Sequence, residues 1–104
     1  MDTNEKGFWS GVAEVIPRTG NHLLEGADGA YVGVVGIAAS EAEFLDNSRI
    51  AFNAMNFDLL ELEDVEFIDS VEKWMEADEV MRERVSALSD RNPIEFGSFH
   101  TFKD

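Results

Sequence analysis

Four acidic side chains, Glu61, Glu63, Asp64 and Glu66, lie among apolar ones in the segment LLELEDVEF. Carboxylates gathered at one place can bind Mg²⁺ or Ca²⁺ through their oxygens, or supply a general acid and a general base. Both kinds of site need ligands that converge from several directions, whereas these four follow one stretch of chain without a DxDxDG loop or a nearby histidine. We therefore predict no metal ion, no cofactor and no catalytic residue, and we interpret the four carboxylates as a binding surface.

A second group of polar side chains lies in PRTGNHLLEGADG, residues 17–29. This connection is far longer than the roughly two to five residues of common hairpin loops, and long ordered loops often carry binding functions. It holds Arg18, Asn21 and His22, which could contact a small ligand. The alternative is a mobile or self-packed loop whose two leucines rest on the edge of a sheet.

Other signatures of chemistry are missing or incomplete. The histidines His22 and His100 are far apart in the sequence, and no serine has the context of a nucleophile elbow. The glycines of GADGAYVGVVG precede a predicted strand and no lysine follows them, so a phosphate-binding loop is not expected. We interpret His100, which lies among phenylalanines, as a packed structural residue.

The net charge is the most unusual property of the chain. There are 22 acidic and 8 basic residues, which give a net charge of −14 at pH 7 and an isoelectric point near 4.3. Such a surface repels phosphate backbones and anionic lipids, so neither nucleic acid nor a membrane is expected as a partner. The same field would speed the encounter with a basic protein.

Length and composition predict a single α+β domain over residues 1–104. Hydrophobic residues make up 44% of the chain, enough for a core of its own, and the absence of cysteine excludes disulfides and thiolate metal sites. No apolar stretch approaches the ~20 residues that span a bilayer, and the polar N-terminal segment does not resemble a signal peptide. We therefore expect a soluble cytoplasmic protein.

Apolar periodicity and capping residues predict the elements that must position these side chains. Strands are expected over residues 8–16 and 30–39, at LLELEDVEF, and over residues 94–102. Ser40 has a glutamate three residues later, which predicts a helix from there to about residue 55. The same spacing after Asp69 predicts a second helix that ends near Ser89.

The uncharged 30–39 strand is apolar on both faces, which is typical of a central strand. Its glycines Gly33 and Gly36 indicate a bulge or the close approach of another element. In LLELEDVEF, Leu60 and Leu62 should share one face, but the apolar residues after Asp64 are out of phase with them. One extra residue at Glu63–Asp64, a β-bulge, restores the phase and turns all the carboxylates toward solvent.

The element order is strand, strand, helix, strand, helix, strand. A strand, a crossover and a parallel strand connect with a right-handed preference, so two such units would place both helices on one face of the sheet. We therefore predict a two-layer α+β sandwich, loosely ferredoxin-like, with about four strands in one mixed sheet. The other face would expose apolar side chains, because the first two strands are apolar on both sides, and we expect a homodimer to cover that face or an edge strand.

These properties favour a noncatalytic module that binds a basic protein partner, for instance an inhibitor or an immunity-type protein. Its binding residues would be Glu61, Glu63, Asp64 and Glu66. The alternative is a small-ligand-binding protein or a minor enzyme that uses the 17–29 loop, with Arg18, Asn21 and His22 as contacts.

Overall fold

The structure is a computed structural model that describes residues 6–76, 79–89 and 91–102. The chain forms β1 (Gly7–Pro17), β2 (Gly29–Ala38), α1 (Glu41–Ala54), β3 (Phe57–Ile68), α2 (Val71–Glu76), α3 (Glu79–Val85) and β4 (Ile94–Phe102). The four predicted strands and the first predicted helix are confirmed. Within the described ranges, no helix is long and apolar enough to cross a membrane.

The four strands form one sheet in the order β3-β1-β2-β4, and each neighbouring pair is antiparallel. The prediction of a mixed, ferredoxin-like sheet is therefore wrong, although the α+β class is confirmed. The reason is the central hairpin, in which β1 and β2 are joined by the 17–29 loop and pair directly with each other. Strand β3 then adds to the free edge of β1, and β4 adds to the free edge of β2. The charge-free strand β2 lies between β1 and β4, as its two apolar faces predicted.

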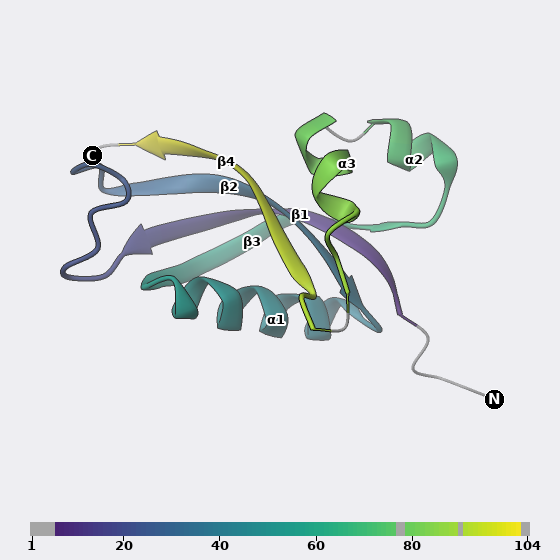
Figure 1. Cartoon of the computed structure of the whole chain (residues 1–104), viewed down its shortest axis with the longest axis horizontal. Coiled ribbons are helices and arrows are strands. Elements are labelled where there is room, and N and C mark those ends of the chain that lie inside the picture. The colour runs from purple at the N-terminus through teal and green to yellow at the C-terminus, as the bar shows by residue number, and fades with distance from the viewer. Residues whose placement is uncertain (1–5, 77–78, 90, 103–104) are drawn as a thin grey trace.

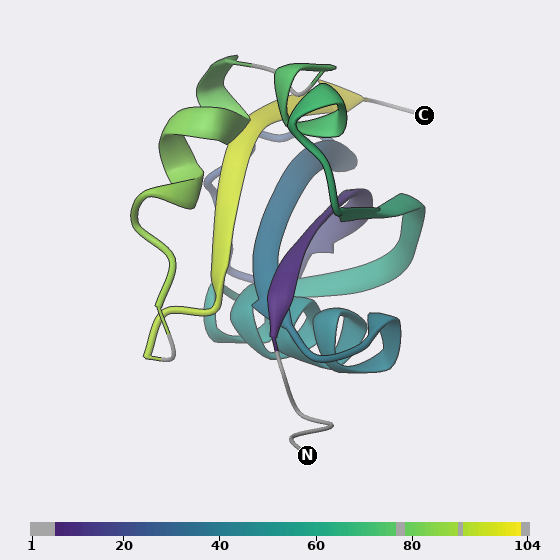
Figure 2. The same cartoon turned by 90° about the vertical axis from the view of Figure 1, so that its right-hand side faces the viewer.

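The helices lie on opposite faces of the sheet (Figure 1), and the view at right angles separates the same layers (Figure 2). Helix α1 contacts β3 and β2 from one side, which we call the α1 face, and α3 contacts β4 and β2 from the other, the α3 face. The prediction that both helices share one face is wrong. The right-handed rule applies to crossovers between parallel strands. Strands β2 and β3 are parallel, but β3 and β4 are antiparallel, so the second connection is free to take the other face.

The main hydrophobic core lies between α1 and the sheet. Buried strand residues on this face meet three fully buried phenylalanines, which come from α1 and the start of β3: Ala13, Val15, Val32, Val34, Phe44, Phe52 and Phe57. The hydroxyl of Ser48, the buried polar side chain of α1, donates to the carbonyl of Phe44 at 2.8 Å. The predicted N-cap is confirmed, because the Ser40 hydroxyl accepts from the Glu43 amide at 3.1 Å.

The second predicted helix is divided into α2 and α3, and residues 77–78 between them lie outside the described part of the chain. Its first turn is capped by Ser70, whose hydroxyl accepts from the Lys73 amide at 3.2 Å, and not by Asp69 as predicted. Helix α3 stops at Val85, before the predicted end. There the Ser86 hydroxyl donates to the carbonyl of Glu83 at 2.8 Å, a local bond that competes with helical hydrogen bonding.

Met81 fixes α3 on the sheet. A Cβ atom added to Gly33 or to Gly97 would lie 3.0 Å from the Met81 sulfur, so the thioether occupies the space that these two glycines leave. The β2–β4 register also shifts opposite Gly33. The predicted bulge or close approach at Gly33 is thus confirmed, and both occur together.

Candidate functional site

A β-bulge orients the predicted carboxylates. In the β1–β3 register Glu66 pairs with Ser10 and Glu63 pairs with Val12, so three residue steps on β3 match two on β1. Asp64 in this bulge has a φ of 52°. The predicted bulge at Glu63–Asp64 is confirmed, and it places Glu63 and Glu66 on the α3 face beside their partners in β1.

A second register shift between β1 and β3 lies earlier in β3, between Leu59 and Glu61, and was not predicted. Glu61 pairs with Glu14, whereas Leu59 pairs with the next β1 residue, Val15, so that Leu60 has no partner of its own. The side chain of Leu60 is 54% exposed. The prediction that Leu60 shares the buried face with Leu62 is therefore wrong, because two bulges interrupt the alternation instead of one.

Glu14 completes a cluster of carboxylates on the α3 face. Carboxylate oxygens of Glu14, Glu61 and Glu63 lie within 4.8 Å of one another, and we call these three residues the carboxylate cluster. Glu14 was not among the binding residues predicted from the sequence. Its alternation with Val12 indicates the face, but only the pairing of β1 with β3 shows that it lies directly beside Glu61.

The Glu61 side chain has the largest effect on the electrostatics of the cluster. The pKa of Glu63 is raised above its ordinary value, first by a hydrogen bond to the Glu61 side chain and then by the negative charge of Glu61, with smaller contributions from desolvation, Asp64 and Glu14. The ion pairs found between described residues lie elsewhere, at Lys6–Glu43, Arg18–Asp58, Arg49–Asp46 and Lys73–Asp69. The cluster therefore carries negative charge without a neutralising side chain in any of these pairs.

We expect Glu63→Gln to raise the melting temperature at neutral pH. A carboxyl group whose pKa is raised in the folded state stabilises that state below the ordinary value of 4.5, and this stability is lost as pH rises through the raised pKa. Glutamine removes the repulsion, so its advantage should vanish below pH 4.5. Thermal unfolding of both proteins across this pH range measures the difference. Glu25→Gln, in the exposed loop, is the control, and an advantage of Glu63→Gln that is independent of pH would contradict this prediction.

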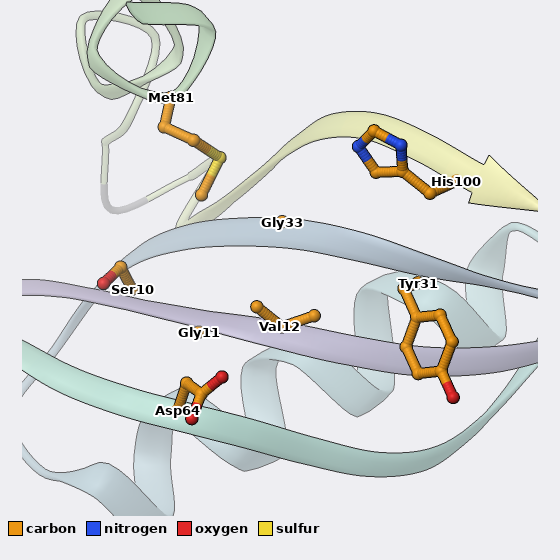
Figure 3. A pocket seen from close by; sticks show the side chains of 8 residues that line it. All are labelled: Ser10, Gly11, Val12, Tyr31, Gly33, Asp64, Met81 and His100. Carbon is orange, nitrogen blue, oxygen red and sulfur yellow. The ribbon is translucent and has the colours of Figure 1, made fainter. Parts of the chain in front are cut away.

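A shallow hollow of about 310 Å³ adjoins the carboxylate cluster on the α3 face (Figure 3). It is lined by Ser10, Gly11, Val12, Tyr31, Gly33, Asp64, Met81 and His100. Val12 and Gly33, which are cross-strand partners, line it on the two central strands, and Met81 lies against Gly33. Along the same rows of the sheet, Glu63 lies next to Val12 and Glu14 lies next to Tyr31. The hollow is therefore mainly apolar and is bordered by carboxylates on its β3 side.

His100 lies at the opposite side of the hollow, directly across from Tyr31 in the β2–β4 register. Its side chain is exposed, so the interpretation as a packed structural histidine is wrong. The phenylalanines nearby in the sequence, Phe96 and Phe99, pack against the core on the α1 face instead. Tyr31 is 42% exposed, and its ring centroid lies 5.2 Å from that of Phe102.

The polar residues of the 17–29 loop are used within the protein. The Arg18 guanidinium donates to Asp58 at 2.9 Å, and the Asn21 amide donates to the carbonyls of Met55 and Asn56 at 3.1 and 2.9 Å. These bonds hold the loop against the turn between α1 and β3 and against the first residues of β3. Leu24 is buried in the core as the self-packed alternative required, whereas Leu23 is 65% exposed.

The structure does not bring the two predicted sites together. Arg18 lines a different hollow, of about 420 Å³, with Arg49, Asn53 and the first residues of β3. His22 is exposed in the loop. The carboxylates of β3, in contrast, share the α3 face with Glu14 and the apolar hollow. This face is where acidic and exposed aromatic side chains meet.

Together the fold and this surface define a small α+β domain with an acidic, partly apolar face. No family model, curated protein or solved structure matches the chain.

Proposed function

We propose that this protein is a noncatalytic binding module that recognises a basic protein partner through its α3 face. The observation that carries the proposal is a group of acidic residues at the β1–β3 pairing, next to an apolar hollow that Asp64 itself lines. The group consists of Glu14, Glu61, Glu63, Asp64 and Glu66. A surface with unneutralised charge and an apolar centre matches the general anatomy of protein interfaces. Its field would steer a positively charged protein into contact.

Exposure of the carboxylates favours binding over catalysis. A general acid that works near neutral pH is usually desolvated or held against a fixed charge in a cleft. Here Glu61 and Glu63 are exposed, and Glu14 is half-buried. An inhibitor or immunity-type protein, which neutralises a basic partner by covering it, needs an accessible surface of this kind.

Binding of a small ligand by the 17–29 loop has less support, because Arg18 and Asn21 already donate hydrogen bonds within the protein. Arg18 donates to Asp58, and Asn21 donates to backbone carbonyls. The homodimer expected from the sequence also has less apolar surface to bury. Helix α3 contacts β2 on the face that was predicted to be free of helices, and Val35 on that face is only 1% exposed. A two-fold contact through the α3 face would bring like charges together, so the edge strand β4, with Glu95 as its acidic residue, is the better place for a second copy.

The test compares two triple variants that change the net charge equally. One replaces Glu61, Glu63 and Glu66 with glutamine, and the control replaces three exposed glutamates in the loop, α1 and α2: Glu25, Glu41 and Glu72. Proteins captured from the host are identified by mass spectrometry, and the affinity of the purified partner is then measured by calorimetry at low and physiological salt. We expect a basic partner that binds about 10- to 100-fold more weakly to the first variant and equally well to the control.

Affinity for the wild type should also fall steeply as salt rises, because exposed charges are screened beyond about 8–10 Å at physiological ionic strength. Equal losses for both triple variants would indicate an effect of net charge alone and would contradict recognition at this face. A partner that binds all three proteins equally would contradict the proposed function.

A further inference from the structure

The hollow on the α3 face has the shape and charge to accept one side chain. We propose that it receives an arginine of the basic partner, an inference that rests on the proposed function and specifies its contact. An arginine combines an apolar stem of three methylene groups with a planar cation. The hollow matches this arrangement, because its base is apolar and its border is acidic.

The base of the hollow suits the stem. Val12 and Gly33 lie at the base of the hollow on the two central strands, and the apolar Met81 side chain, which packs against Gly33, forms the wall toward α3. Figure 3 shows Met81 reaching down from α3 above Gly33, with Val12 on the neighbouring strand. A methylene chain laid on this base removes apolar surface from water on both molecules.

The border of the hollow suits the guanidinium. Asp64 lines it from the β3 side, and Glu63 is the direct cross-strand neighbour of Val12. Carboxylates accept paired hydrogen bonds from a guanidinium, which is the strongest common geometry for this kind of ion pair. Tyr31, which is 42% exposed, adds an aromatic ring of the type on which arginine stacks.

These features favour arginine over other ligands. An anion would be repelled by Asp64 and by the adjacent carboxylate cluster. A lysine would find the same charge, but its compact ammonium group gains less from a paired carboxylate geometry and from an aromatic face. A bare metal ion would leave the apolar base of the hollow unused, and the volume of about 310 Å³ is suited to a side chain.

The hollow is shaped before any partner binds. Met81 is seated where Gly33 and Gly97 lack side chains, so α3 already contributes one wall of the hollow. The base of the hollow belongs to the two central strands of the sheet. A site on rigid elements loses little conformational entropy when it is occupied, which favours a specific contact.

The test is an NMR titration of the whole protein with three blocked tripeptides, Gly-Arg-Gly, Gly-Lys-Gly and Gly-citrulline-Gly. Citrulline has the shape of arginine without its charge. We expect saturable shifts of the Val12 and Met81 methyl signals with the arginine peptide, binding several-fold weaker with the lysine peptide, and no saturable shift with citrulline. Contacts between arginine methylene protons and the Met81 methyl group, seen as nuclear Overhauser effects, would place the stem in the hollow.

Two variants separate the hollow from general attraction. Tyr31→Ala should weaken binding of the arginine peptide about tenfold. Phe8→Ala should leave it unchanged, because Phe8 is an equally exposed aromatic residue of the same face, at 40%, outside the hollow. Preserved signal dispersion in the spectra shows that each variant is folded.

Failure of this inference is distinguishable from failure of the proposed function. If the arginine peptide shifts only acidic residues, or if Tyr31→Ala binds it as well as the wild type does, the hollow is not the arginine site. The basic partner would then still respond to the Glu61, Glu63 and Glu66 triple variant. If that variant has no effect on the partner, the proposed function fails as well.

Discussion

Replacing Phe44 with alanine is expected to lower the free energy of unfolding by about 3–5 kcal/mol, a large part of the total stability of a small domain. Phe44 is fully buried at the centre of the contact between α1 and the sheet. Its ring stacks on Trp9, with centroids 6.3 Å apart, and lies so close to Gly36 that an added Cβ would be 2.8 Å from two ring atoms. The sheet backbone cannot move into the space that alanine would leave, so the cavity remains.

Urea denaturation followed by circular dichroism measures this loss. Phe8→Ala is the matched control, because Phe8 lies on the other face and is 40% exposed, so its removal should cost less than half as much. Similar losses for the two variants would show that α1 is not packed on the sheet through Phe44. An unchanged slope of stability against urea would confirm that both variants unfold from the same compact state.

Replacing Gly29 with alanine is the second change with a large expected effect, a loss of about 3 kcal/mol, at the upper end of the range for overpacking. An added Cβ at Gly29 would lie 2.7 Å from the carbonyl oxygen of Val15 and 2.5 Å from the ring of Phe102. The ring can rotate away. The carbonyl belongs to the central hairpin and cannot move without disturbing the β1–β2 register.

Gly33→Ala is the control for this second change, because it adds the same methyl group four residues further along β2. There the nearest atom is the Met81 sulfur at 3.0 Å, the flexible end of a side chain that can yield. Alanine is also favoured over glycine within a strand by about 0.5–1 kcal/mol, so the net change should be close to zero. Equal destabilisation by both substitutions in urea denaturation would contradict the distinction between a rigid carbonyl and a flexible thioether.

The sequence alone determined the features that depend on neighbours along the chain. Alternation located β3 and β4, β-branched and aromatic residues located β1, and a charge-free run located β2. The Ser40–Glu43 spacing located the start of α1. The phase change between Leu62 and Val65 located the bulge at Asp64, because a single extra residue leaves a visible break in the alternation. The adjacent leucines Leu59 and Leu60 break the alternation in the same way, so the sequence also carried a signal of the second register shift, which the prediction missed.

The side of the sheet on which α3 packs was decided by the tertiary structure. The handedness rule would have settled it only if β3 and β4 were parallel, and their direction depends on which strands are neighbours. That order follows from the pairing of β1 with β2, a contact between segments separated by a long loop. The local sequence of α3 does not indicate this strand order. Met81 packs on the sheet there only because Gly33 and Gly97 are adjacent in space.

The candidate site shows the same division. The sequence specified the acidic residues of β3 and the net charge of −14, because composition and alternation are properties of the chain itself. Only the pairing of β1 with β3 shows that Glu14 belongs to the site. Only the packing of α3 on the sheet shows that Tyr31 and Met81 line the same hollow. The physical reason is that a surface is formed by side chains that are remote in sequence, and strand pairing, which depends on contacts across the whole domain, determines which of them meet.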